Sequence, residues 1–224
     1  MRTAKPAPPA VKSSLSEQAF GMLEEMIVTL KLPPGSLWSE ATLSESLGIG
    51  RTPVREAIQR LAEYHLVVIM QRHGIRIAEV NEQEQLLVLE TRRELERLIA
   101  TRAARRACAA DKQMLATMAQ ALLAAGKSGD VVEMLRQYFV AKKFMARCAG
   151  NRFSEQAIAP LYTLSRRFYY MHHEELNDVS EVARLHADLL RAVATGDEEE
   201  AAAACERQID YAAAFAKRII TRGF

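Results

Sequence analysis

Apolar residues recur at helical spacing over residues 20–30, near the start of the chain. Ser14, with Glu17 three residues later, has the spacing of a capping box, so we expect a helix over residues 15–30. Two prolines and a glycine at 33–35 must end this helix because these residues do not continue helical structure.

Two short helices are predicted next, separated by a tight turn. Ser39 is a candidate N-cap of the first, with Leu43 on its inner face. Residues 48–50 provide the turn, and Thr52 is expected to cap the second helix, with Pro53 at its first position. The pattern therefore indicates a helix-turn-helix.

The spacing of apolar residues then changes from helical to extended. Residues 66–70 and 75–80 are rich in β-branched residues and flank a glycine-containing turn, which predicts a β-hairpin. From Asn81 to the end the pattern is helical again, with five or six helices of 15 to 28 residues expected. Breaks are predicted near Asp111, 126–130, 150–151, 177–178 and 196–197.

The predicted fold is mainly α. A winged helix-turn-helix with a small β-hairpin occupies residues 14–80, and an all-α helical bundle occupies residues 81–224. Residues 1–13 contain three basic and no acidic residues and are expected to form a flexible arm.

Composition narrows the class of protein. Apolar residues make up 49% and charged residues 26% of the chain, which is ordinary for a globular protein. Basic and acidic residues number 30 and 28, so a basic surface that binds nucleic acid must be confined to one part of the chain. No apolar run approaches the roughly 20 residues that span a bilayer, so we expect a cytoplasmic protein with no membrane partner. Cys108, Cys148 and Cys205 form no CxxC pair and are interpreted as small core or near-core residues.

Basic side chains cluster at the start of the second short helix and at the hairpin tip. Arg51 and Arg55 lie one turn apart on the side of the helix away from its apolar stripe. An arginine there can bind guanine with two hydrogen bonds or contact a phosphate. A solvated helix face and a purely structural hairpin are the alternative, but the ordered combination of turn, helix and basic hairpin favours DNA binding. The expected DNA-binding residues are Gly50, Arg51, Thr52, Arg55, Arg72, His73 and Gly74.

These residues carry a family resemblance. The string RTPVREA at 51–57 is highly specific for the GntR family of bacterial regulators, which the N-terminal region resembles. Members usually have a DNA-contacting arginine where this chain has Ala41, so recognition is expected to depend more on Arg51, Arg55 and the wing. The supporting positions are Leu32-Pro33-Pro34-Gly35, Ser39-Glu40, the rest of residues 43–57, and His73-Gly74.

The helical remainder resembles the FCD-type effector domain of the FadR subfamily. The resemblance implies a helical bundle that binds small organic acids, often with a divalent metal held by one Asp and three His, in a homodimer whose DNA affinity changes with effector. Its signposts are Glu90-Thr91-Arg92-Arg93-Glu94-Leu95-Glu96, Ala149-Gly150-Asn151, His186 with Leu189, and Gly196-Asp197.

The metal positions of that family correspond here to Tyr138, Lys142, His186 and Gln208, so one ligand of four is retained. A protonated lysine cannot coordinate, and glutamine and neutral tyrosine are weak donors, so neither metal nor another cofactor is expected. We hypothesise that the Lys142 ammonium replaces the cation and attracts an anionic effector, with Arg92 as its partner. Alternatively, Lys142 is a surface residue and His186 a hydrogen-bonded core residue. The expected effector-binding residues are Arg92, Tyr138, Lys142, His186 and Gln208.

The sequence thus predicts a ligand-responsive, sequence-specific DNA-binding transcriptional regulator, a repressor that senses a small organic acid. Its expected partners are double-stranded palindromic operator DNA, a small carboxylate and a second copy of the chain. No nucleophile elbow, phosphate loop or dinucleotide fingerprint indicates an enzyme. Adjacent histidines in the run 169–173 point about 100° apart on a helix, which argues against a metal site there. A helical-bundle enzyme and a ligand-independent architectural DNA binder are the alternatives.

Overall fold

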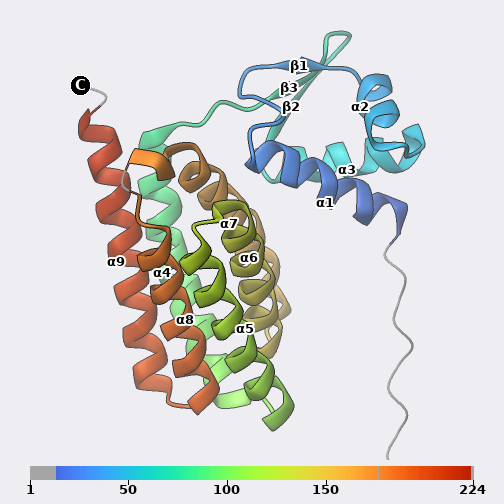
Figure 1. Cartoon of the computed structure of the whole chain (residues 1–224). Coiled ribbons are helices and arrows are strands. Elements are labelled where there is room, and N and C mark those ends of the chain that lie inside the picture. The colour runs from blue at the N-terminus through green and yellow to red at the C-terminus, as the bar shows by residue number, and fades with distance from the viewer. Residues whose placement is uncertain (1–13, 176, 223–224) are drawn as a thin grey trace, which may run out of the picture.

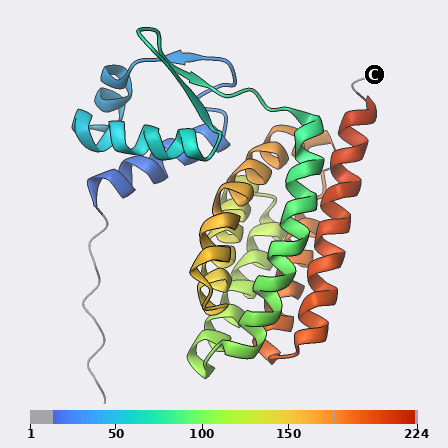
Figure 2. The same ribbon diagram turned by 180° about the vertical axis from the view of Figure 1, so that it is seen from behind.

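The computed structural model describes residues 14–175 and 177–222. The predicted basic arm, residues 1–13, lies outside this part of the chain. The described residues form a small winged helix and a larger helical bundle, joined by an extended connecting segment at residues 78–81 (Figures 1 and 2). The first helix of the winged helix lies beside one end of the bundle (Figures 1 and 2).

The winged helix contains three helices and a three-stranded antiparallel sheet with strand order β1-β3-β2. Buried side chains of α1, α3 and the sheet, including Leu23, Ile58 and Ile75, form its core. The elements are α1 (Leu15–Val28), β1 (Leu37–Trp38), α2 (Glu40–Leu47), α3 (Arg51–Glu63), β2 (Val67–Met70) and β3 (Gly74–Ile77).

Two of the predicted helix starts in this domain are confirmed and one is wrong. Ser14 forms the expected capping box with Glu17, and the side chain of Ser39 accepts a hydrogen bond from the backbone of Thr42. The third helix begins at Arg51 after Gly50, so Thr52 is not its N-cap but its second residue. Arg51 therefore lies in the first turn of α3, where backbone N–H groups have no partner within the helix.

Strand β1 was not predicted, because two residues are too few to show an alternating pattern. Leu37 pairs with Arg76, and Trp38 pairs with Ile75. This pairing explains Gly74, whose φ is +90° and where an added Cβ would lie 2.5 Å from the Trp38 carbonyl oxygen. A side chain at position 74 would therefore separate β1 from the hairpin.

Six helices make up the bundle over the described residues. Its core joins apolar side chains from all six, among them Ile99, Leu122, Met145, Tyr162, Leu189 and Ile209. The helices are α4 (Glu82–Arg106), α5 (Ala109–Ser128), α6 (Val131–Cys148), α7 (Arg152–His172), α8 (Val179–Thr195) and α9 (Glu198–Arg222), with a short 3₁₀ turn, η1 (His173–Glu175), after α7. No described helix is both long and apolar enough to cross a membrane.

The predicted breaks near Asp111 and within 126–130 are confirmed, because α4 ends at Arg106 before α5 begins at Ala109, and α5 ends at Ser128 before α6 begins at Val131. Asp111 itself lies in the first turn of α5 and accepts a hydrogen bond from the Cys108 backbone N–H at 3.1 Å. Gly126 lies inside α5, and a Cβ there would be 2.5 Å from the Ala183 Cβ. This glycine therefore permits close packing of α5 on α8 rather than ending a helix. Cys108 is exposed, so its interpretation as a core or near-core residue is wrong.

Candidate functional site

The N-terminal end of α3 is open to solvent. Arg51, Thr52 and Arg55 are exposed, whereas Val54 and Ile58 on the opposite side of the helix are buried. The predicted amphipathic character of this helix, with its arginines on the exposed side, is therefore confirmed. Ala41 is also exposed on α2, so the family arginine that it replaces would have been a surface residue.

Arg55 is held by a carboxylate that the sequence analysis did not identify. Its Nε donates to Glu40 Oε1 at 3.1 Å and its Nη2 donates to Oε2 at 2.7 Å. The side chains of Arg55 and Glu40 remain 60% and 35% exposed. The hydrogen bond from Arg55 lowers the pKa of Glu40. The pair fixes the position of one arginine on the exposed face of α3 and leaves Arg51 without such a restraint.

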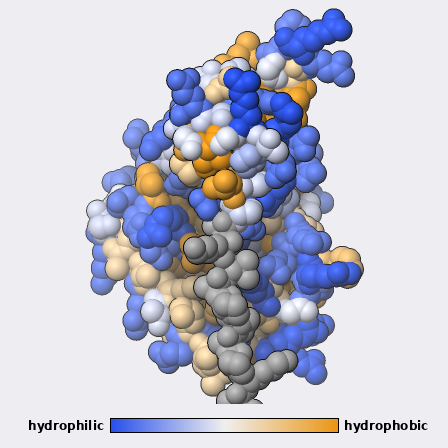
Figure 3. All heavy atoms as spheres, turned by 90° about the vertical axis from the view of Figure 1, so that its right-hand side faces the viewer, coloured by the Kyte–Doolittle hydropathy of each residue, from blue (hydrophilic) through white to orange (hydrophobic). Residues whose placement is uncertain are grey.

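The hairpin tip between β2 and β3 carries exposed Arg72 and His73. Arg72 has φ +63°, which reverses the chain before Gly74. Arg76 on β3 is a further exposed arginine that the sequence analysis did not include. The hairpin tip projects at the top of Figure 1, and the outermost atoms at the top of Figure 3 are hydrophilic, with hydrophobic atoms beside and below them.

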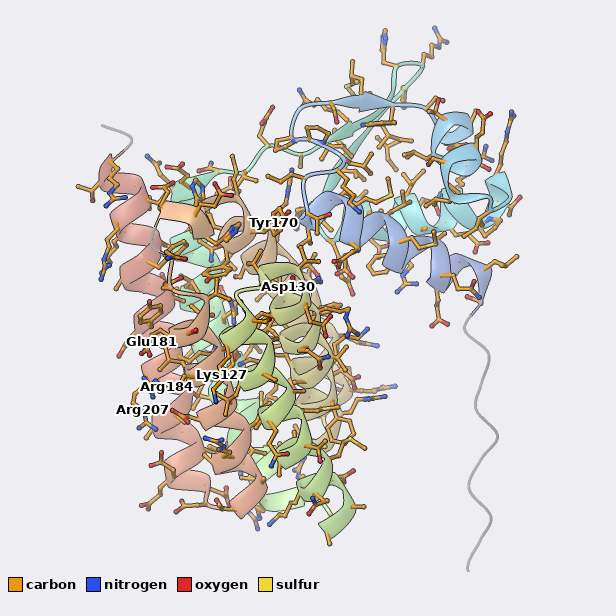
Figure 4. The ribbon with its side chains drawn as sticks, viewed as in Figure 1. Lys127, Asp130, Tyr170, Glu181, Arg184 and Arg207 are labelled. Atoms are coloured by element: carbon orange, nitrogen blue, oxygen red, sulfur yellow. The ribbon has the colours of Figure 1, made fainter. Side chains whose placement is uncertain are left out.

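The core of the bundle contains an ionic cluster centred on Glu96. The Nε of Arg92 donates to Glu96 Oε1 at 2.8 Å, and the ammonium of Lys142 contacts Oε2. Lys142 also donates to Gln208 Oε1 at 2.7 Å. All four side chains are at most 4% exposed. By contrast, the ion pair between Glu181 and Arg184 lies on the outer face of α8 (Figure 4).

The charges in this cluster follow from mutual attraction and burial. Burial acts to raise the pKa of Glu96, but Arg92 and Lys142 outweigh it and lower this pKa to about 2. Burial lowers the pKa of Lys142, with Glu96 opposing the effect. Glu96 is therefore ionised and holds both basic groups.

Two aromatic residues extend the cluster. The Tyr138 hydroxyl accepts a hydrogen bond from Arg92 Nη2 at 3.1 Å, and the Tyr138 and His186 ring centroids are 4.4 Å apart. Burial raises the pKa of Tyr138 to about 12. Burial and the charge of Lys142 lower the pKa of His186 to about 3, so its imidazole is neutral near pH 7. The His186 Nδ1 atom is buried and has no hydrogen-bond partner in the described structure.

A cavity of about 60 Å³ lies against this cluster, several times the roughly 10–15 Å³ that one water molecule requires. Four of the five predicted effector-binding residues line it: Arg92, Tyr138, His186 and Gln208. Lys142 does not; it lies behind the cavity, against Glu96. The other lining residues are Gln85, Leu135, Ser165, Arg166, Phe168, Tyr169, Val182, Leu185, Tyr211, Ala212 and Phe215.

Glu96 is the member of the cluster that the sequence analysis missed. Its spacing from Arg92, four residues, is also that of an ordinary surface ion pair on a helix. A signal was nevertheless present: Leu89, Ile99 and Ala103 extend the same stripe at intervals of three and four residues, and all are buried. A carboxylate within an apolar stripe must face the core and requires a partner there.

The side chains at the four metal positions suggested by the resemblance do not fit a divalent cation. The Lys142 ammonium occupies one position and is paired with Glu96, while Gln208 and Tyr138 offer weak neutral donors. The described residues contain no group of three or more His, Cys, Asp or Glu side chains that could hold a metal. His172 and His173 have separate partners, Glu175 Oε1 at 3.0 Å and the Tyr170 carbonyl at 2.7 Å.

One turn of α7 contacts both the cavity and the winged helix. Arg166 lines the cavity, and its Nη2 donates to Glu25 Oε2 of α1 at 2.8 Å. The next residue, Arg167, donates from Nη2 to the Ala78 carbonyl of the connecting segment at 2.6 Å. Three residues before Arg166, the hydroxyl of Thr163 donates to buried Glu24 of α1.

Solved structures with the same two-domain fold include Escherichia coli McbR/YncC, with a TM-score of 0.81 and 20% identity over 93% of this chain and all of that chain. A putative transcriptional regulator GntR from Rhodococcus sp. RHA1 has a TM-score of 0.70 and 16% identity, and the match covers 91% of this chain and 98% of that one. At these identities the likeness shows the fold, and it confirms the predicted combination of winged helix and helical bundle.

Sequence relatives match over the N-terminal region. An uncharacterized HTH-type transcriptional regulator of Streptomyces ambofaciens is 41% identical over 59 residues, which are 26% of this chain and 25% of the relative. The HTH-type transcriptional regulator Mce2R of Mycobacterium tuberculosis is 39% identical over 64 residues, which are 28% of this chain and 27% of the relative. The chain thus spans about a quarter of the length of these two curated relatives.

Two family models match consecutive parts of the chain. The model described as bacterial regulatory proteins of the gntR family covers residues 15–77, and the FCD domain model covers residues 87–211, which is more than half of the chain. The matched proteins are transcriptional regulators rather than enzymes. With a winged helix at its N-terminus and an FCD domain after it, this chain belongs to the gntR family of bacterial regulators.

Proposed function

We propose that this chain is a cytoplasmic repressor that binds a palindromic operator as a homodimer and changes its DNA affinity when a small organic acid enters the bundle cavity. The observation that carries the sensing role is the cavity itself. Its wall combines the buried guanidinium of Arg92 with the buried Nδ1 of His186, which has no hydrogen-bond partner in the described structure. Both groups can form hydrogen bonds with an anionic oxygen.

The surface of the winged helix supports the DNA-binding role. The first turn of α3 can enter a major groove, where exposed Arg51 would contact a base and Arg55, fixed by Glu40, a base or a phosphate. Backbone N–H groups near Gly50 and Thr52 would bind phosphate. The wing residues Arg72, His73 and Gly74 would contact the adjacent backbone or groove.

Within the cavity, Arg92, Tyr138, His186 and Gln208 would contact the effector, and Lys142 would act from behind them through Glu96. A ligand-independent architectural DNA binder has no use for a cavity lined by ionisable groups. The tie between α7 and α1 gives the cavity a physical connection to the winged helix.

A gel shift with the full chain tests this function. DNA from upstream of its own gene should be retarded at lower protein concentration than a scrambled duplex of equal length. A mixture of small carboxylic acids should change the amount of protein required, and a reporter fused to that DNA should be less active when the chain is present.

Light scattering should give the mass of two chains, and footprints should show half-sites about 10 base pairs apart or a multiple of that distance. Equal affinity for the scrambled duplex would reject sequence-specific regulation. An affinity for DNA that no carboxylate changes would reject the sensing role and leave DNA binding intact.

A further inference from the structure

The buried cluster holds an odd number of charged groups. Arg92 and Lys142 are both basic, and they share the single carboxylate of Glu96. The neighbouring groups add no charge, because the Tyr138 phenol and the His186 imidazole are both neutral near pH 7. The Lys142 nitrogen contacts Glu96 Oε2 and donates to Gln208 Oε1, an arrangement that suits an ammonium, so the cluster contains one more positive than negative charge.

None of the described residues that line the cavity supplies the missing negative charge. The lining contains no Asp or Glu side chain. Its other basic residue, Arg166, donates to Glu25 on α1, which compensates its charge, while its Nε and Nη1 have no hydrogen-bond partner in the described structure. An uncompensated charge in a protein interior is costly, so an anion that enters this cavity gains the full attraction of the cluster.

The available hydrogen-bonding atoms define where such an anion would bind. The hydrogen bonds from Arg92 to other described residues come from Nε and Nη2, which leaves the N–H groups of Nη1. The buried His186 Nδ1 has no partner in the described structure and belongs to the same cavity wall. One carboxylate group can be bound by these atoms together.

The remainder of the cavity wall is mostly apolar. Leu135 of α6, Phe168 of α7, Leu185 of α8 and Phe215 of α9 line it, and none of them can bind a second charged group. A second carboxylate would meet no uncompensated cation, because Arg166, the other basic side chain of this wall, is already paired with Glu25. The ligand must therefore carry its charge at one end and an apolar body at the other.

Resting on the sensing function proposed above, we infer that this cavity selects a small organic monoanion with an apolar body and excludes dianions, because Glu96 already neutralises one of the two buried cations. Glu96 acts as a built-in counter-ion. The site then accepts one negative charge on the ligand, which equals the two cations of the cluster, Arg92 and Lys142, minus the carboxylate of Glu96.

The test compares ligands that have similar bodies and different charge. Butyrate, succinate and butyramide carry one, two and no negative charges, and benzoate, phthalate and benzamide repeat the series on an aromatic body. Dissociation constants of the full chain would be measured by calorimetry and supported by ligand-induced shifts of thermal unfolding. In at least one series the monoanion should bind at least tenfold more tightly than the dianion and the amide.

Charge variants then make the inference specific to the cluster. Glu96→Gln leaves two uncompensated cations and should shift the preference towards the dianion. Lys142→Met leaves none and should abolish the advantage of the monoanion over the amide. The double variant Glu96→Gln/Lys142→Met again has one excess cation and should restore the preference for the monoanion, which keeps the test valid if a single variant folds poorly.

Two surface variants serve as matched controls. Glu94→Gln removes a carboxylate from the exposed face of the same helix, and Lys127→Met removes an exposed ammonium from α5. Both should leave the order of affinities unchanged.

The outcomes separate the two levels of the proposal. If no carboxylate of either series binds to the wild-type chain, the sensing function and the charge rule are both overturned. If dianions bind as tightly as monoanions, the cavity still senses acids and only the charge rule is wrong. If the double variant behaves like Lys142→Met, net charge does not control selection, and the rule is overturned as well.

Discussion

Each half of this molecule contains an arginine bound to a glutamate, and the two pairs differ in burial. In the winged helix, Arg55 and Glu40 are 60% and 35% exposed. In the bundle, Arg92 and Glu96 are 4% and 0% exposed. Solvent screens the first pair, whereas the second lost its hydration when the protein folded. The exposed pair could therefore take part in the proposed DNA binding at little cost to folding, whereas the buried pair would affect both the proposed ligand selection and the stability of the fold.

The largest difference between the two pairs should appear when the buried carboxylate is removed. Glu96→Ala leaves two cations without their partner, so we expect a loss of about 3–5 kcal/mol in the free energy of unfolding. Urea denaturation of the full chain measures it. Glu94→Ala on the exposed face of α4 should change stability by less than about 0.5 kcal/mol. Similar losses for the two variants would contradict the buried network.

Acid should act on the same pair. The pKa of Glu96 is lowered to about 2 in the folded chain, below its ordinary value of 4.5, so its stabilising contribution is present above pH 4.5 and is lost as the pH falls towards 2. A shift of this size corresponds to about 3 kcal/mol. Unfolding free energies measured from pH 6 to pH 2 should fall less steeply in Glu96→Gln than in the wild type. Parallel curves would show that Glu96 is not the group responsible.

In the winged helix a surface arginine should affect binding and leave folding unchanged. Arg51→Ala should cost roughly 1–3 kcal/mol of affinity for a specific operator if the side chain binds a base. Fluorescence anisotropy on operator and scrambled duplexes measures the effect. Arg97→Ala, an exposed arginine of the bundle, controls for the change in net charge. An operator affinity that Arg51→Ala leaves intact would exclude a base contact.

The smallest effect is expected for the exposed counterpart of Glu96. Glu40→Gln keeps the shape of the side chain but weakens the pairing with Arg55. Exposed pairs contribute about 0.2–1 kcal/mol, so the midpoint of urea unfolding should hardly move. Thermal or chemical unfolding of this variant beside Glu96→Gln provides the direct comparison. A loss as large as that of Glu96→Gln would show that burial does not distinguish the two pairs.

The two halves also differ in how well the sequence predicted them. The proposed DNA-binding residues occupy two short runs, 50–55 and 72–74, so local spacing and turn residues were sufficient to predict the helix-turn-helix and hairpin that carry them. The wrong start of α3 shows the limit of this reasoning. Thr52 resembles an N-cap, but the helix begins two residues earlier than that cap implies because Gly50 takes the cap position without any side-chain hydrogen bond.

The bundle site depends on contacts that local patterns do not contain. Gln208 and Glu96 lie 112 residues apart in sequence, and the helices that carry them meet only in the folded core. The resemblance to a known domain brought Arg92, Tyr138, His186 and Gln208 together correctly as one cavity wall. It did not reveal that Lys142 is engaged by an internal carboxylate, because that pairing depends on a contact between α4 and α6 that neither local pattern contains.

Helix α7 contacts both halves of the molecule. Ser165, Arg166 and Phe168 face the cavity, and Arg166 and Arg167 hold α1 and the connecting segment. If the cavity binds the proposed ligand, a displacement of this stretch would be passed to α1 and the connecting segment through these two arginines. Ligand binding would then alter how the winged helix is oriented towards the operator, while the internal packing of that domain stays unchanged.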